Sequence, residues 1–241
     1  MSKEANRQES KWAKEQVLSL QSPVSNLQFS KLPITIHQLP MPSILLATNN
    51  KDKIIELQDL LKDLNLQLLT PAEIHLELDV VEDGLTYAEN ASKKALAFAQ
   101  ASGLISLADD SGLEVDAING EPGLYSARYG SIDGKKLSDG ERRKYLLSKL
   151  QNHPRPWTAR FKATIAIAST NYQLQITEGI CEGEIISEER GTGGFGYDPI
   201  FLFPELGKTM SELSMDEKNR LSHRAKAVMK AKDVLKERFS G

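Results

Sequence analysis

Residues 43–69, SILLATNNKDKIIELQDLLKDLNLQLL, decide the fold class of this chain. An apolar run at residues 44–47 is typical of a buried strand, and the polar Thr48-Asn49-Asn50 ends it. Leucine and isoleucine then recur at helical spacing as far as Leu64, and a second apolar run covers residues 66–69. This strand–helix–strand unit predicts an α/β fold.

Apolar periodicity extends the same fold along the chain. The alanine-rich residues 87–101 predict a helix that Gly103 ends, because glycine readily adopts the left-handed conformation found there. Residues 105–108 predict a buried strand that runs into Asp109-Asp110-Ser111-Gly112. Further expected elements are a helix at residues 138–150, strands at 161–169, 173–179 and 182–188 with a turn at 170–172, and one long helix at 215–239. We therefore expect a mixed α/β domain over residues 43–241.

Residues 1–42 differ from this domain and are expected to be an N-terminal extension. They contain a short amphipathic pattern at residues 12–20 and four prolines that interrupt regular structure. Their start has the composition of neither a secretory signal nor a transit peptide. No apolar run in the chain approaches the roughly 20 residues that span a bilayer. The single cysteine, Cys181, excludes an internal disulfide framework. These features favour a cytoplasmic protein with no membrane partner.

The charges of the chain are nearly balanced. Its 30 Lys and Arg residues against 33 Asp and Glu give a net charge of −3. This balance predicts no general attraction to nucleic acid. A basic cluster, interrupted by two acids, is interpreted as a mostly solvated helix face: Lys135, Lys136, Arg142, Arg143 and Lys144. Phosphate binding would therefore need a local site.

A glycine-rich stretch, GTGGFGYDP at residues 191–199, is a candidate ligand loop. Its glycines permit positive φ and close approach to a ligand, while Phe195, Tyr197 and Asp198 add two rings and a carboxylate. We expect Pro199 to keep Asp198 out of helical geometry and in extended structure. The stretch fits two structures equally: a cradle for a flat polar ligand such as a nucleotide base, or a turn with an aromatic plug.

Residues 48–53, TNNKDK, are a candidate anion site. They lie where a strand turns into a helix, so free backbone N–H groups and the helix dipole favour negative charge. Thr48 and Asn50 add donors, and Lys53 adds a positive charge. The P-loop spacing is absent. A polar helix cap followed by a lysine-rich first turn accounts for the same residues.

The adjacent carboxylates of Asp109 and Asp110 are a candidate magnesium site. Burying them is costly unless they are solvated, paired or bound to a cation, and oxygen ligands of this kind suit Mg²⁺. Because neighbouring strand residues point to opposite faces, one aspartate can serve the site while the other supports the scaffold. Glu82, in an acidic loop, is a possible second ligand. The alternatives are an Asx-type turn closed by Gly112 and a simply solvated loop.

Other polar residues give weaker signals. Lys218, His223 and Arg224 are donors that would favour the O6 and N7 acceptors of a 6-oxopurine over the amino group of adenine. They also fit an ordinary polar helix face. Arg128 fits a phosphate contact or an exposed position, and Glu89-Asn90 fits the charged start of a helix.

Six motifs in this order and spacing resemble the Ham1 family of inosine/xanthosine triphosphate pyrophosphatases: ATNNKDKIIEL, EDGLTYAEN, ADDSGLEVD, PGLYSARY, GTGGFGYDPIF and EKNRLSHR. The resemblance covers about residues 43–239. It implies an elongated mixed-sheet domain of two lobes with a central nucleotide-binding cleft, usually assembled as a homodimer. It also implies Mg²⁺-dependent hydrolysis of ITP, dITP and XTP to the monophosphate and pyrophosphate.

The resemblance further implies roles for single residues. Asp110 would be the catalytic, metal-associated carboxylate, acting as base or as metal ligand, and Glu82 would also hold the metal. The implied substrate-binding residues are Thr48, Asn49, Asn50, Lys51, Asp52, Lys53, Ser111, Phe195, Gly196, Tyr197, Asp198, Lys218, His223 and Arg224. One departure is Asn49, where the family often has glycine. The sequence leaves open how guanine would be excluded.

Three alternative functions agree less well with the sequence. A Maf-like pyrophosphatase is disfavoured by the glycine loop and the Ser-His-Arg motif at residues 222–224. A non-catalytic nucleotide sensor has no need for Glu82, Lys53 and Asp110 together. An RNA-binding module is disfavoured by the acidic balance of the chain.

Overall fold

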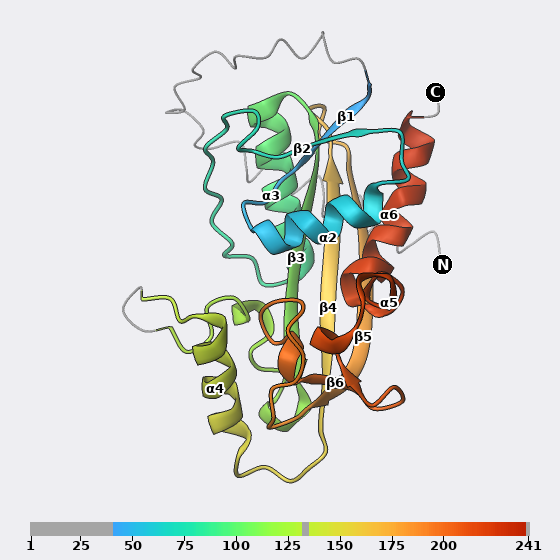
Figure 1. The fold of residues 1–241 in the computed structure, drawn as a ribbon. Coiled ribbons are helices and arrows are strands. Elements are labelled where there is room, and N and C mark those ends of the chain that lie inside the picture. Colours follow the sequence, from blue (N-terminus) through green and yellow to red (C-terminus); the bar gives the residue numbers. More distant parts are fainter. Residues whose placement is uncertain (1–40, 132–134, 240–241) are drawn as a thin grey trace, which may run out of the picture.

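The computed structural model describes residues 41–131 and 135–239 (Figure 1). Within these ranges seven strands form one mixed sheet in the order β2-β1-β3-β4-β5-β6-β7. The strands are β1 (Ser43–Leu46), β2 (Gln67–Leu69), β3 (Ile105–Val115), β4 (Trp157–Ala168), β5 (Leu174–Ile185), β6 (Phe201–Phe203) and β7 (Lys208–Thr209). The α-helices are α2 (Lys51–Leu61), α3 (Tyr87–Ser102), α4 (Asp139–Leu150), α5 (Met215–Leu221) and α6 (His223–Phe239). The mixed α/β class is thus confirmed, and the amphipathic pattern at residues 12–20 lies outside the described residues.

The upper part of the sheet in Figure 1 carries helices on both faces. Strands β1, β2 and β3 are parallel, and their connections pass through α2 and α3. Side chains alternate along each strand, so Leu107 packs with α2 and α6 while its neighbour Ala108 packs with α3. Burial of these two apolar layers fixes the carboxyl ends of the parallel strands in place.

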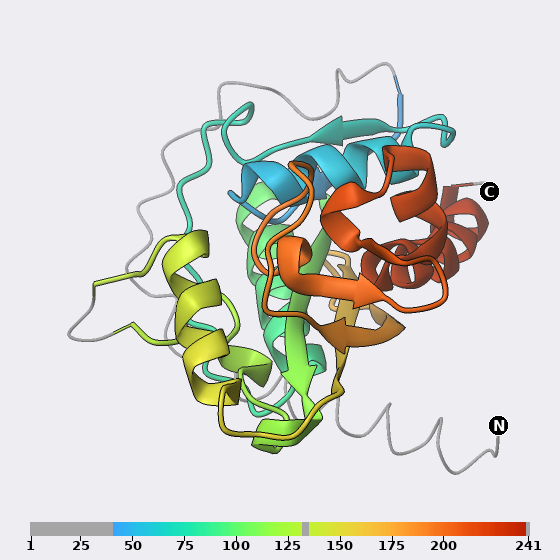
Figure 2. The same cartoon turned by 60° about the horizontal axis from the view of Figure 1, so that its bottom comes forward.

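Three long antiparallel strands, β3, β4 and β5, carry the sheet into the lower part of the molecule (Figure 1). There α4 packs through Leu146 and Leu150 onto a separate apolar cluster that includes Trp157 and Tyr197. Figure 2 shows α4 lying beside the sheet, away from α5 and α6. The division into two lobes around a central cleft stays a prediction.

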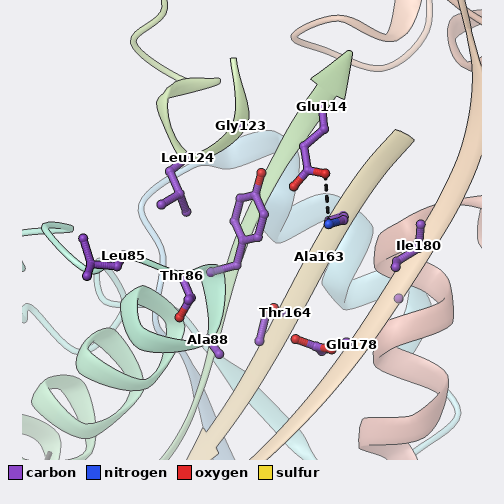
Figure 3. Close-up of a pocket in the computed structure, with 13 residues that line it drawn as sticks. Leu85, Thr86, Ala88, Glu114, Gly123, Leu124, Ala163, Thr164, Glu178 and Ile180 are labelled. Atoms are coloured by element: carbon purple, nitrogen blue, oxygen red, sulfur yellow. Dashed lines mark ion pairs between the residues drawn. The ribbon is translucent and has the colours of Figure 1, made fainter. Parts of the chain in front are cut away.

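Part of the sheet face shared with α3 lacks a helical cover. Ile176 and Ile180 on β5 are 36% and 44% exposed, respectively. Figure 3 shows the hollow on this face, where Leu85 and Leu124 lie across from Thr164 and Ile180. Its volume is about 510 Å³. Lys162 and Glu114 form an ion pair of 2.9 Å within it.

Several expected elements are confirmed. Gly103 ends α3 in the left-handed conformation with φ 74°, and Ser138 caps α4. The turn between β4 and β5 lies at residues 169–173, where Tyr172 has φ 61°. No helix within residues 41–131 and 135–239 is long and apolar enough to cross a membrane.

Three boundaries were wrong. Strand β3 does not stop before Asp109 but continues to Val115, so Gly112 lies inside a strand and closes no Asx-type turn. Residues 173–179 and 182–188 do not form two strands, because β5 runs unbroken through Gly179 to Ile185. The expected single helix at 215–239 is two helices that meet at Ser222.

Candidate functional site

A cavity of about 170 Å³ lies where α2, β3, the glycine loop and the start of α6 meet. Thirteen of the sixteen catalytic, metal-binding and substrate-binding residues that the resemblance implies line it: Asn50, Asp52, Lys53, Glu82, Asp110, Ser111, Phe195, Gly196, Tyr197, Asp198, Lys218, His223 and Arg224. Six separate chain segments therefore supply one site, from residue 50 to residue 224.

The N-terminus of α2 forms one wall of this cavity. Asn50 is the N-cap, and its Oδ1 accepts hydrogen bonds from the backbone N–H groups of Asp52 and Lys53 at 3.0 and 3.1 Å. Capping occupies the side-chain oxygen and leaves the amide NH₂ as a donor. The capped helix end therefore still offers donors to an anion.

Three other residues of the candidate anion site, Thr48, Asn49 and Lys51, lie differently. The Oγ1 of Thr48 accepts a hydrogen bond from the backbone N–H of Asn50 at 3.2 Å. Thr48, Asn49 and Lys51 do not line the cavity in the part of the chain that is described, and their binding role stays a prediction. The described non-glycine residues with positive φ are His75, Asn119 and Tyr172. Asn49 thus needs no left-handed conformation at the position where glycine was expected.

Asp109 is the scaffold member of the aspartate pair. It is fully buried and receives Lys53 Nζ at 2.7 Å on Oδ1 and Arg224 Nε at 2.6 Å on Oδ2. Ser111 Oγ also donates to Oδ1, at 3.0 Å. Burial alone would raise the pKa of Asp109, but the charges of Arg224 and Lys53 outweigh it and hold that pKa well below its ordinary value. Asp109 therefore joins a cation on α2, Lys53, to a cation on α6, Arg224.

Asp110 has the opposite environment, as strand alternation predicts. Burial raises the pKa of Asp110 to about 6, although the charges of Lys53 and Lys94 oppose the rise. Its Oδ2 is buried without a hydrogen-bond partner among the described residues. An unpartnered carboxylate oxygen facing a cavity is unfavourable in isolation, so this atom is poised to take a proton or a cation.

Glu82 lies next to this carboxylate. It pairs with Lys94 Nζ and is close enough to raise the pKa of Asp110. Burial opposes ionisation of Glu82, but Lys94 outweighs it and lowers the pKa of Glu82. Two carboxylates and room for ligand oxygens suit Mg²⁺, which keeps several waters and takes few protein ligands. The donor set therefore fits this metal.

The other end of the cavity holds cations fixed by acids. Lys218 Nζ lies 2.6 Å from Glu56 Oε1 and 2.7 Å from Asp198 Oδ2. Burial opposes the charge on Lys218, but these two acids outweigh it and raise its pKa. Arg224 is also paired with Glu56. Lys218 and Arg224 each lie 5.5 Å from the centre of the Phe195 ring. This end thus presents hydrogen-bond donors beside an aromatic face.

His223 enters the site as a neutral ring. Burial and the positive charge of Arg224 lower the pKa of His223 well below its ordinary value, so it carries no charge at pH 7. The ring stacks on Phe161 with 4.7 Å between centroids. A neutral imidazole offers one donor and one acceptor.

The glycine loop has a tightly packed conformation, which is compatible with both of its expected structures. Gly194 has φ 71°, and a Cβ there would lie 2.1 Å from Asp198 Oδ2, so a larger residue does not fit. The same oxygen accepts from the Phe195 N–H at 3.0 Å. The expectation for Asp198 was wrong, because it begins a 3₁₀ turn that includes Pro199. Proline suits the first turn of a helix because its missing N–H would be unpaired there.

Sequence reasoning missed Glu56, Lys94 and a role for Asn90 beside Asp110. The Asn90 side chain forms a hydrogen bond to Asp110, and Lys94 Nζ donates to the Asp109 carbonyl at 3.2 Å. The spacing of residues 90 and 94 places both on one face of α3, a usable signal. Glu56 was missed because one acid among apolar helix positions does not indicate a site.

The two weaker candidates, Arg128 and Glu89, have different positions. Arg128 lines the cavity, whereas Glu89 accepts the Leu85 N–H at 2.6 Å, as an acid at the start of a helix does.

The interpretation of the basic cluster was wrong for two of its members. Lys135, Lys136 and Lys144 are exposed, as expected. Arg142 and Arg143 instead turn inward with side chains only 14% and 13% exposed. Arg142 lines the cavity, and Arg143 reaches the glycine loop.

Comparisons with known proteins identify a family and several relatives to which this chain is similar. The model of the Ham1 family matches residues 44–234. The dITP/XTP pyrophosphatase of Desulforamulus reducens is 49% identical over 193 residues, covering 80% of this chain and 94% of the relative. The enzyme of that name from a strain of Thermus thermophilus is 46% identical over 186 residues, covering 77% and 87%. A solved structure of a HAM1 protein from Coxiella burnetii is 41% identical with a TM-score of 0.73, covering 82% of this chain and 100% of that one.

Proposed function

This chain belongs to the Ham1 family, and we propose that it hydrolyses purine nucleoside triphosphates with a 6-oxo base, namely ITP, dITP and XTP, to the monophosphate and pyrophosphate. One observation carries the proposal. A single cavity combines the capped N-terminus of α2 and Lys53 with the unpartnered carboxylate of Asp110, and it ends at Phe195 beside Lys218 and Arg224. The end at Asp110 and Lys53 suits the phosphates of a nucleotide, and the end at Phe195 suits its base.

The base end would select the keto form of a purine. Lys218 and Arg224 are donors without acceptor capacity, so they pair with O6 and N7 but not with the amino group of adenine. Phe195 offers a face for stacking, with both cations nearby. The printed names of the relatives from D. reducens and T. thermophilus agree with such a base.

The phosphate end would bind the triphosphate and orient the attacking water. Donors at the start of α2 face the phosphates, and Lys53 offsets the charge that grows on the pyrophosphate leaving group. Asp110 either accepts the proton of the water or holds a cation that acidifies it. Its raised pKa suits a group that gains and loses a proton near neutral pH.

We also propose that the enzyme requires Mg²⁺. Asp110, with its unpartnered Oδ2, and Glu82 would hold the ion. When bound, Mg²⁺ would neutralise phosphate oxygens and lower the pKa of coordinated water. No cluster of three or more His, Cys, Asp or Glu side chains that could hold a metal occurs in residues 41–131 and 135–239. The remaining ligands would therefore be waters and substrate oxygens.

The setting of the enzyme completes the proposal. We propose a cytoplasmic house-cleaning role that removes deaminated purine nucleotides, with residues 43–241 as the catalytic domain and residues 1–42 as an extension. Neither nucleic acid nor membrane is a proposed partner. We further propose a homodimer, for which the uncovered hollow in Figure 3, with exposed Leu85 and Ile180, offers a surface.

Product analysis tests this function. The purified full chain is incubated with Mg²⁺ and ITP, XTP, ATP or GTP, and the products are separated. We expect monophosphate and pyrophosphate from ITP and XTP, and loss of turnover when EDTA removes the metal. Release of orthophosphate and a diphosphate, or full activity in EDTA, would contradict the proposed reaction.

A further inference from the structure

The N-terminal turn of α4 holds the glycine loop through one residue. The Gly196 N–H donates to Asp139 Oδ2 at 2.6 Å, and the Gly196 carbonyl accepts from Arg143 Nη1 at 2.7 Å. Both backbone groups of Gly196 thus bond to side chains of a helix more than 50 residues earlier in the chain. We call Asp139 and Arg143 the α4 clamp.

Each member of the α4 clamp is itself fixed by a second contact. Arg143 Nη2 donates to Glu189 Oε2 at 2.8 Å, so this arginine binds the chain both before the glycine-rich stretch and within it. Asp139 pairs through its other oxygen with Arg142, which donates from Nη1 to the Leu137 carbonyl at 2.7 Å. Charge-assisted bonds of this kind are stronger and more directional than neutral ones. The clamp is therefore a stiff support.

The clamped residue lies between two side chains of the cavity. Gly196 has φ 60°, a backbone conformation that residues other than glycine rarely adopt. Its neighbour Phe195 is the ring that faces Lys218 and Arg224, and its other neighbour Tyr197 donates to the Ser126 carbonyl at 3.0 Å. Because the peptide planes on both sides of Gly196 are held, the backbone that carries the Phe195 side chain is held as well.

We propose that Asp139 and Arg143 are positioning residues for base recognition, acting through Gly196 to keep Phe195 ready to stack on the base. This inference rests on the proposed function, since it names how that same site is held. A glycine-rich segment has many accessible conformations, and ordering it during binding weakens affinity. The clamp removes that loss before the nucleotide binds. Asp139 lines the same cavity as Asp110, whereas Arg143 is not among the residues that line it, so Arg143 gives the cleaner test of positioning.

The structural half of the proposal is tested without nucleotide. Amide hydrogen exchange followed by NMR is compared in the wild type, Asp139→Ala and Arg143→Met. We expect the Gly196 amide to lose protection by about tenfold or more in Asp139→Ala, as one hydrogen bond is lost. Lys144→Ala is the matched control, because it removes a neighbouring cation of α4 and leaves both Gly196 bonds in place. Unchanged exchange at Gly196 would overturn the inference whatever the enzyme does.

The functional half is tested by steady-state kinetics with ITP and ATP. Arg143→Met and Asp139→Ala should raise KM for ITP about 3- to 30-fold, the effect of one or two hydrogen bonds, with kcat within about twofold of wild type. Their preference for ITP over ATP should fall. Arg143→Lys, which keeps a donor for the Gly196 carbonyl, should recover part of the affinity. A drop in kcat at unchanged KM, or no change in either, would refute the positioning role. A wild type that leaves ITP uncut would instead contradict the proposed function, and hydrogen exchange would still judge the clamp.

Discussion

The two ends of the cavity are built in different ways. Around Asp110 the functional groups stand on regular elements, since β3, α2 and α3 supply the carboxylate, the helix N-terminus and Lys94. Around Phe195 the aromatic face stands on a glycine-rich loop that is held by Asp198 and by the α4 clamp, while Lys218 and Arg224 stand on α5 and α6. Under the proposed function, the chemistry would rest mainly on packed strands and helices, whereas the stacking face for the base would rest on a loop with external support. Substitutions at the two ends should therefore change different quantities, with a lower kcat at the Asp110 end and a higher KM at the Phe195 end.

The strongest contrast is expected at Asp110. Asp110→Asn should lower kcat by about 10²–10⁴-fold, the usual contribution of a group that handles a proton in the transition state. The fold should survive, because asparagine removes a charge that burial disfavours. Initial rates with ITP and a urea titration measure both. Near-normal turnover would refute the catalytic role of this carboxylate.

The neighbouring aspartate should show the reverse pattern in stability. Asp109→Asn leaves Arg224 and Lys53 without their shared counter-charge, and breaking a buried ion pair costs about 3–5 kcal/mol. Urea denaturation of this variant beside Asp110→Asn gives the comparison. If the two variants lost equal stability, the division into a scaffold and a functional aspartate would be wrong.

The pH dependence of stability separates the same pair in metal-free protein. The pKa of Asp110 is raised to about 6 from an ordinary value near 4, so its ionisation destabilises the fold as pH rises through this window, by about 3 kcal/mol in full. Asp110→Asn should then be more stable than wild type above pH 6 and equal to it below about pH 4. Asp109 has a lowered pKa, so its stabilisation is present above about pH 4 and is lost as pH falls below it. Unfolding in EDTA between pH 3 and 8 checks both slopes, and a pH-independent difference between Asp110→Asn and wild type would contradict the first.

The smallest effect is expected at the loop end. Phe195→Ala should raise KM for ITP about 5- to 150-fold, since stacking of one base on an aromatic ring contributes about 1–3 kcal/mol. Turnover at saturation should change little, and Phe195→Tyr should restore affinity. Kinetics over a range of ITP concentrations separate the two constants. A loss confined to kcat would mean that the loop takes part in the chemical step.

Local patterns predicted most of the fold because apolar spacing reports directly on burial. The failures came where one residue serves an unexpected neighbour. Gly179 looked like the end of a strand, but it lies inside β5. Glycine is needed there because a Cβ would lie 2.1 Å from the His223 carbonyl oxygen of α6. Ser222 interrupts a helical pattern that continues on both sides. Its N–H donates to the Lys218 carbonyl and ends α5, and its Oγ accepts a hydrogen bond from the Ala225 N–H in the first turn of α6. Neither role is visible in apolar periodicity.

The candidate site was predictable to the extent that its residues lie in recognisable motifs. Lys53 lies in the first turn of a helix, where ligand groups are expected, while Asp110 belongs to a recognisable acidic motif within β3 and the glycine loop follows β5. The partners that hold them were not predictable in the same way. Glu56 and Arg143 have their roles only through contacts with residues 168 and 53 positions away. Such contacts depend on the folded chain, and a basic helix face gives no sign of them.

The most direct test of the central claim is the ratio of kcat/KM for ITP to that for ATP, with pyrophosphate release as the signal. Because Lys218 and Arg224 are proposed to donate to O6 and N7 of the base, and adenine carries an amino group in place of O6, the ratio should be at least about 100. Both substrates share the triphosphate, so the phosphate end cannot produce this difference. A ratio near one would contradict the claim that one cavity cleaves at the Asp110 end and reads the base at the Phe195 end.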